Sequence, residues 1–164
     1  MTNFYNHILN LHGKTAIFID MDGVIADYDN DPNFDKYVNG FYLKKRPVIT
    51  TISIFKKLST IPNVTLYLLS GHAGEDEEQK IAEKNTWIDK NAPFFKKENR
   101  IFNSPRVFDN QTNRIGKAKS VEQTIASVSY DNIFQIDDDV RVIKGTNNYS
   151  KGKITMLHVI SILD

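Results

Sequence analysis

Apolar residues gather in three short runs along this chain, at residues 16–19, 64–69 and 132–136. Each run is mostly apolar on both of the faces that an extended strand would present. Each run also ends at a polar residue, which limits it to the length of a strand. The three runs therefore predict strands that are buried on both faces.

Between and around these runs, apolar residues recur every three or four positions, as they do along one face of a helix. This spacing predicts helices over residues 48–58, 75–91 and 117–127. The second of these begins with a cluster of acidic residues, which stabilise the positive end of a helix dipole. Strands that alternate with helices predict an α/β fold, in which helices cover both faces of a mainly parallel sheet.

The remaining segments carry weaker patterns. Short apolar stretches predict strands at residues 101–102, 141–143 and 154–159, with a loop over residues 145–152 between the last two. Residues 103–116 are rich in Asn, Ser, Pro, Asp, Gln, Thr and Gly, which predicts an irregular loop. A loop of that length inside a compact domain is usually functional or mobile.

Two segments lie outside this alternation. Residues 1–13 are polar with scattered apolar residues, and predict a short turn that docks before the first strand. Residues 28–46 follow the first strand, and their aromatic and apolar residues at spacings of three and four predict a short helix. We interpret this second segment as a very small cap insertion in a single domain that spans residues 1–164.

The composition is ordinary for a globular domain. Of 164 residues, 40% are hydrophobic and 25% are charged, and the formal net charge is +1. The absence of cysteine excludes disulfides, thiolate zinc sites and cysteine nucleophiles. No segment is long and apolar enough to cross a bilayer, and no signal-peptide pattern is present. We therefore expect a cytoplasmic protein without a membrane partner.

The first apolar run ends in the most informative stretch of the chain, Asp20-Met-Asp22-Gly23. Side chains alternate along an extended strand, so the two carboxylates are expected to point the same way. Gly23 allows a sharp turn that brings backbone N–H groups close to whatever the acids hold. Buried carboxylates need a partner, and Mg²⁺ takes carboxylate and carbonyl oxygens. A strand end followed by an Asp-rich turn without a ligand is the alternative interpretation.

Polar residues also follow the other two runs. Ser70 and Gly71 come directly after the second run, and Asp137 and Asp138 come directly after the third. In a parallel sheet, the carboxyl ends of the strands lie on one edge. The sequence therefore predicts that these residues gather with the two acids of the first strand.

A lysine is expected beside these acids, at the start of the helix that precedes the third strand. Both Lys117 and Lys119 lie there. We favour Lys117, because Val121, four residues further on, then begins the buried face of the helix. Lys119 stays open as the alternative.

This set of residues fits phosphoryl transfer. Asp20 would attack phosphorus and form an aspartyl-phosphate, which divides hydrolysis into two steps. Asp22 would protonate the leaving oxygen and then accept a proton from water. Asp20, the backbone carbonyl of Asp22 and Asp137 would hold Mg²⁺, with Asp138 bound through water. The Ser70 hydroxyl, nearby backbone N–H groups and the lysine would bind the phosphate.

The four motifs resemble those of the haloacid dehalogenase (HAD) superfamily of phosphatases. They are Asp20-Met-Asp22-Gly23-Val24, the strand-end Ser70, a lysine at a helix start, and Asp137-Asp138. Their order and spacing agree over most of the chain. The resemblance implies a Rossmann-like three-layer sandwich, dependence on Mg²⁺ and hydrolysis of phosphate monoesters.

Within that superfamily, residues 18–27, 40–70 and 84–87 contain stretches that resemble the 5′(3′)-deoxyribonucleotidases. This resemblance implies a nucleotidase that releases phosphate from (deoxy)nucleoside monophosphates. That family carries a helical cap of several dozen residues, whereas only residues 28–46 are available here. The site should therefore be more open. The phosphorylated end of a polynucleotide and a small sugar or cofactor phosphate stay open as alternative substrates.

The aromatic residues of the insertion allow two interpretations. Tyr28, Phe34 and Phe41 could stack on a substrate ring, as aromatic side chains do on nucleic-acid bases. Alternatively, they pack the insertion onto the domain. We interpret His72 as a loop histidine, with a place at the rim of the site as the alternative. We interpret Asp139 as a turn or helix-cap residue rather than a third ligand.

A non-enzymatic module that binds phosphate is the remaining alternative. Receiver domains also combine aspartates with a lysine, but they carry the phosphate-accepting Asp on a middle strand. Here the middle apolar run ends in Ser70, which favours an enzyme.

Overall fold

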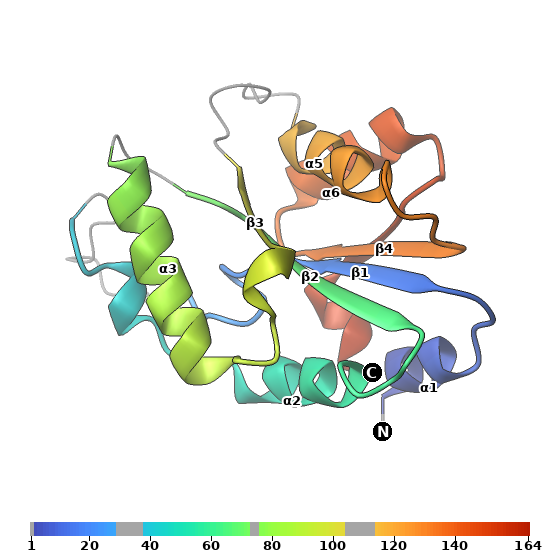
Figure 1. The fold of residues 1–164 in the computed structure, drawn as a ribbon, viewed down its shortest axis with the longest axis horizontal. Coiled ribbons are helices and arrows are strands. Elements are labelled where there is room, and N and C mark those ends of the chain that lie inside the picture. The colour runs from blue at the N-terminus through green and yellow to red at the C-terminus, as the bar shows by residue number, and fades with distance from the viewer. Residues whose placement is uncertain (1, 29–37, 73–75, 104–113) are drawn as a thin grey trace.

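A computed structural model describes residues 2–28, 38–72, 76–103 and 114–164 (Figure 1). Its α-helices are α1 (Asn3–Leu9), α2 (Ile49–Leu58), α3 (Glu77–Asn91), α5 (Gly116–Ile125) and α6 (Val140–Ser150). Its strands are β1 (Thr15–Ile19), β2 (Val64–Gly71), β3 (Arg100–Asn103), β4 (Asn132–Asp137) and β5 (Thr155–His158). Short 3₁₀ turns lie at Tyr42–Lys44, Lys97–Asn99 and Val159–Ile162.

The strands form one five-stranded sheet in the order β3-β2-β1-β4-β5, and every neighbouring pair is parallel. β1 lies in the centre, where Ile19 is in register with Leu68 of β2 and Ile136 of β4. The carboxyl ends of these strands therefore lie together on one edge of the sheet. This arrangement confirms the predicted α/β fold with a Rossmann-like parallel sheet.

Helices cover both faces of the sheet. In the view of Figure 1, α1 and α2 lie below it, and α5 and α6 lie above it. Ile17 and Ile19 of β1 pack into the core on the side of α1, α2 and α3. Phe18, between them, faces the other way, where it stacks on Tyr67 and shares a core with Val121 of α5. Burial on both faces follows from this alternation, and the three layers match the predicted sandwich.

The strand at residues 141–143 and the loop at 145–152 were wrong predictions, because helix α6 occupies most of this stretch. Asp139 caps the helix, since its carboxylate accepts the Arg141 N–H at 2.8 Å. The capping prediction for Asp139 is confirmed. Val142, Thr146 and Ser150 are buried at spacings of four, which is a helical period. Only one of these three is apolar, so the apolar pattern concealed the helix.

Residues 1–13 contain a short helix, α1, in place of the predicted turn. Phe4 and Ile8 lie on its buried face. The N–H of Asn3 donates to the carbonyl of Asp164 at 2.6 Å, which joins the two ends of the described chain. No helix in the described segments is long and apolar enough to cross a membrane.

The predicted loop at 103–116 lies largely outside the described residues, and so does the predicted helix within the insertion. Residues 38–46 of the insertion are attached to helix α3. The buried Glu83 carboxylate accepts the Gly40 N–H at 2.6 Å, and the Trp87 indole N–H donates to the carbonyl of Lys45 at 2.8 Å. These bonds fix the insertion beside the carboxyl edge of the sheet.

Helix α6 approaches the backbone of Arg114 at Gly145, where an added Cβ would lie 2.6 Å from the Arg114 carbonyl oxygen. Alanine favours a helix over glycine by about 1 kcal/mol, whereas overpacking costs about 1–3 kcal/mol. We therefore expect Gly145→Ala to lower the free energy of unfolding in a urea titration by about 1 kcal/mol. Asn148→Ala, at an exposed position of the same helix, should not lower it. Stabilisation by both variants would contradict the close approach.

Candidate active site

A cavity of about 260 Å³ lies at the carboxyl edge of the sheet. It is lined by residues that follow several strands, by the start of α5 and by the insertion. Most of the predicted site residues lie in its wall, among them Asp20, Asp22, Gly71, Lys117, Asp137 and Asp138. The folded chain thus gathers groups that are more than a hundred positions apart in the sequence.

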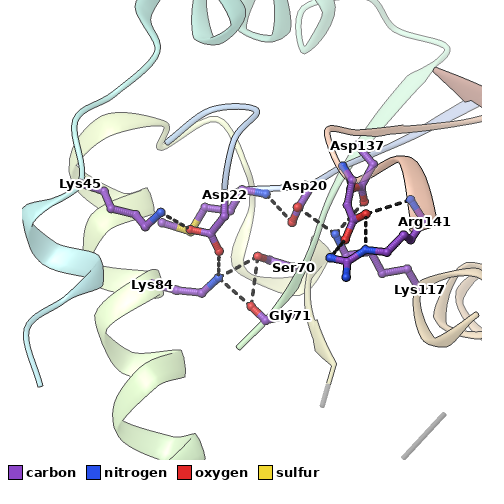
Figure 2. Close-up of polar contacts among 11 residues, drawn as sticks. Asp20, Asp22, Lys45, Ser70, Gly71, Lys84, Lys117, Asp137 and Arg141 are labelled. Atoms are coloured by element: carbon purple, nitrogen blue, oxygen red, sulfur yellow. Dashed lines mark hydrogen bonds and ion pairs between the residues drawn. The ribbon is translucent and has the colours of Figure 1, made fainter. Parts of the chain in front are cut away.

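Asp20 directly follows the central strand β1 and is 7% exposed. Its N–H donates to the carbonyl of Ile136, and its carboxylate accepts the N–H of Met21 at 2.7 Å. The Lys117 ammonium lies 2.9 Å from the other carboxylate oxygen (Figure 2). Burial raises the pKa of Asp20 to about 6, although the charge of Lys117 opposes this shift.

Lys117 bridges two carboxylates. Its Nζ lies 2.7 Å from Asp137 as well as 2.9 Å from Asp20. Burial alone would lower the pKa of Lys117, but the two carboxylates raise it above its usual range. Lys119, the alternative, is half-buried and does not line the cavity. The geometry therefore favours Lys117 as the lysine beside the acids.

Asp22 has different partners. Its carboxylate lies 2.5 Å from the Nζ of Lys84 and 2.9 Å from the Nζ of Lys45, and both lysines are buried (Figure 2). Burial would raise the pKa of Asp22, but these two ammonium groups hold it below its usual value. Asp20 and Asp22 both line the cavity, yet their pKa values shift in opposite directions.

Lys84 is a site residue to which the sequence analysis assigned no role. Besides Asp22, its Nζ donates to the Ser70 hydroxyl at 2.8 Å and to the Gly71 carbonyl at 2.7 Å. A signal was present in the sequence, because Lys84 shares the inward face of α3 with Trp87 and Ile88. A lysine on an apolar face needs a buried partner.

Ser70 is fully buried, and its hydroxyl accepts from Lys84. Gly71 lines the cavity, whereas Ser70 is not part of its wall. Direct contact of Ser70 with a phosphate therefore stays a prediction.

Among the aromatic residues of the insertion, Tyr28 and Phe41 line the cavity, and Phe34 lies outside the described residues. The Nζ of Lys45 lies 5.0 Å from the ring centre of Tyr28 and 5.1 Å from that of Phe41. These rings thus pack around a buried cation at one side of the cavity.

Three carboxylates could hold a divalent cation. Asp20, Asp137 and Asp138 each offer one oxygen, and these atoms lie within 4.8 Å of one another. Oδ1 of Asp138 is buried and has no hydrogen-bond partner among the described residues. Burial, together with the charge of Asp20, raises the pKa of Asp138. An unpaired carboxylate oxygen beside two further acids fits a hard cation such as Mg²⁺.

Gly23 brings the turn after β1 close to Asp138. Its φ is +78°, which favours glycine, and an added Cβ would overlap the Asp138 carboxylate and the Tyr28 ring. The Tyr28 ring and the Asp138 carboxylate thus both lie against this turn. The glycine of the motif therefore permits the close approach of these groups.

No protein-family model matches this chain, and no curated protein matches it. Among solved structures, it is similar to a chain of the Pnkp1/Rnl/Hen1 RNA repair complex, with a TM-score of 0.63 and 13% identity, over 89% of this chain and 43% of that chain. The protein thus spans less than half of that chain, and the likeness concerns the fold alone. The HAD domain of effector protein Lem4 from Legionella pneumophila gives a TM-score of 0.47 and 15% identity, over 88% of this chain and 84% of that domain. That score is too low to support an argument.

The raised pKa of Asp20 predicts the effect of neutralising it. Ionisation of Asp20 costs folding free energy as the pH rises from its ordinary pKa of 3.8 through the folded value of about 6. In the presence of a chelator, we expect Asp20→Asn to raise the free energy of unfolding by about 1–3 kcal/mol at about pH 8. This gain in the free energy of unfolding should disappear at about pH 4. Urea titrations at both pH values measure it.

Asp22→Asn should have the opposite effect. The lowered pKa of Asp22 means that its ionised form stabilises the fold at a pH above 3.8, and that this contribution is lost as the pH falls further. The variant leaves Lys45 and Lys84 buried without an anionic partner, so we expect a loss of about 3–5 kcal/mol at neutral pH. If Asp20→Asn and Asp22→Asn both raised, or both lowered, the free energy of unfolding, the assigned ion pairs would be contradicted.

Proposed function

We propose that this protein is a Mg²⁺-dependent phosphomonoester hydrolase of the HAD type, and that it acts on (deoxy)nucleoside monophosphates. The observation that carries the proposal is the arrangement of Asp20, Lys117, Asp137 and Asp138 around one cavity. A nucleophile, a lysine and an acidic pair at one sheet edge are what stepwise phosphoryl transfer requires. The motif resemblance described above supports the same assignment.

In the proposed first step, the Asp20 carboxylate attacks phosphorus while the bond from phosphorus to the leaving alcohol breaks. The product is an aspartyl-phosphate on Asp20, which water then hydrolyses. With a pKa of about 6, Asp20 is largely ionised at neutral pH and available as a nucleophile. Lys117 supports this state, and its ammonium also offsets the charge of the transferring phosphoryl group.

Asp22 is the proposed proton carrier. It gives a proton to the leaving alcohol in the first step, and takes one from the attacking water in the second. Lys45 and Lys84 hold it ionised before substrate enters. A phosphate dianion placed beside Asp22 raises the pKa of its carboxyl group, so protonation of Asp22 accompanies substrate binding.

Asp20, Asp137 and Asp138, with the backbone carbonyl of Asp22, are the proposed Mg²⁺ ligands. When bound, the ion supplies positive charge that offsets the charge on the phosphate oxygens. The backbone at Gly71 lies in the cavity wall and is proposed to bind phosphate, with Ser70 and Lys84 behind it.

Hydrolysis of p-nitrophenyl phosphate and of deoxynucleoside monophosphates tests the proposal. We expect EDTA to abolish release of phosphate and Mg²⁺ to restore it. We expect Asp20→Asn to lower kcat by at least about 10³-fold, because the nucleophile is lost. Glu98→Gln, which neutralises an exposed acid outside the cavity, is the matched control. Full activity of Asp20→Asn would exclude the covalent route, and an aspartyl-phosphate that persists for hours would favour the receiver-like alternative.

The end of a polynucleotide is a second candidate substrate. The insertion after β1 spans only residues 28–46, and the fold is shared with a chain of an RNA repair complex. A panel of deoxynucleoside monophosphates, 3′- and 5′-phosphorylated oligonucleotides and sugar phosphates separates the candidates. A clear preference for oligonucleotides would replace the nucleotidase assignment.

A further inference from the structure

The cavity wall beside β2 contains a histidine that the proposed reaction does not use. His72 follows β2 directly and is 7% exposed. Its Nε2 lies 2.9 Å from a carboxylate oxygen of Glu77, the first residue of α3. Its Nδ1 is buried and makes no hydrogen bond within the described part of the chain.

Asn103, the last residue of β3, supplies a second unused polar atom. It is in register with Gly71 of β2, the residue before His72, so the two side chains come from neighbouring strand ends. Its Oδ1 is buried and likewise lacks a hydrogen-bond partner among the residues that the structure describes. Both residues line the cavity that contains Asp20. Because unpaired buried polar atoms are costly, a ligand in the cavity would stabilise them.

The nearby lysines do not supply the missing hydrogen bonds. An ammonium group has three N–H donors. Lys84 directs hydrogen bonds to Asp22, Ser70 and Gly71, which uses all of them. Lys117 pairs with carboxylates on the other side of β1. Neither lysine therefore pairs with His72 Nδ1 or Asn103 Oδ1, and a bound molecule that carries a donor would pair with them.

The hydrogen bond to Glu77 determines which nitrogen of the His72 imidazole is left to accept from a ligand. A carboxylate only accepts, so the ring nitrogen that faces Glu77, Nε2, carries the proton of that hydrogen bond. Nδ1 then presents a lone pair to the cavity, and the amide oxygen of Asn103 presents another acceptor. A phosphate dianion has no donor and is disfavoured here, whereas a hydroxyl group can donate to either atom.

We propose that His72 and Asn103 form a leaving-group subsite that selects phosphomonoesters whose alcohol carries neighbouring hydroxyl groups, as the 2′,3′-diol of a ribose does. The inference rests on the proposed phosphatase function and specifies its substrate class. Glu77 is a positioning residue, because it fixes the tautomer of His72 and has no assigned contact with substrate. The subsite favours ribose over a deoxygenated sugar, and a single phosphate over two.

Matched substrates test the subsite. AMP and 2′,3′-dideoxy-AMP share the base and the phosphate and differ only in the two hydroxyl groups. We expect the wild type to prefer AMP by about tenfold or more in kcat/KM, because loss of the hydroxyls leaves buried acceptors unpaired. His72→Phe keeps a ring of similar size, and Asn103→Leu keeps a similar volume. Each should reduce the preference to about threefold or less, mainly by slowing AMP hydrolysis.

Two further variants separate recognition from a structural effect. In Glu77→Gln, the amide can donate to Nε2 and thereby allow the ring proton to move to Nδ1. We expect this variant to lose part of the preference for AMP while the ring stays in place. His12→Phe changes an exposed histidine outside the cavity wall and should keep the full preference.

The outcomes distinguish failure of the subsite from failure of the proposed function. Hydrolysis of p-nitrophenyl phosphate with equal rates for AMP and dideoxy-AMP would overturn the subsite and leave the phosphatase intact. Glycerol 1-phosphate and propyl phosphate form a second pair, and a preference for the hydroxylated member of either pair supports the subsite. If no ester is hydrolysed, the proposed function fails. In that case, calorimetric titration of AMP and of 2′,3′-dideoxy-AMP into the Asp20→Asn protein tests the subsite by binding alone. Equal affinities for the two nucleotides would refute the subsite.

Discussion

Buried ion pairs between lysines and aspartates are the interaction on which the rest of this structure depends. Among the described residues, five aspartates line one cavity. The carboxylate of Asp139 pairs with Arg141, and the other four would repel one another strongly in a site shielded from water. Three buried ammonium groups compensate for most of this charge, and each comes from a different element: the insertion, α3 and α5. The charged centre therefore connects both helical layers and the insertion to the carboxyl edge of the sheet. The residues concerned are Asp20, Asp22, Asp137, Asp138, Lys45, Lys84 and Lys117.

The ion pairs divide the site into two halves with different electrostatic properties. On the side of α5, Lys117 is shared between two acids, and Asp138 keeps an unpaired oxygen, so this half still attracts positive charge. On the side of α3, Asp22 pairs with two lysines, so its negative charge is already more than compensated. Neighbouring carboxylates of one motif thus differ in their pKa shifts, because pKa values depend on surroundings as well as on residue type.

Fixed walls surround this centre. Helix α3 holds residues 38–46 of the insertion through the Glu83 carboxylate and the Trp87 indole. It also supplies Lys84 to the ion pair with Asp22, and Glu77 to the hydrogen bond with His72. One helix therefore positions the insertion, a charged group of the site and the proposed leaving-group subsite together. Its buried face carries Lys80, Glu83 and Lys84, and each of them pairs with a group more than 40 positions away in the sequence.

The sequence by itself determined the mainly parallel sheet and the meeting of Asp20, Asp22, Asp137 and Asp138, whereas the structure decided between Lys117 and Lys119. Buried strands have a local apolar signature, and the parallel rule then places their carboxyl ends on one edge. Only the tertiary structure decided the roles of residues on helical and loop segments. Periodicity shows which face of α3 turns inward, but the partner of Lys84 is 62 positions away. The burial of His72 and the helical state of 141–143 likewise depend on contacts between distant segments, which a local pattern cannot contain.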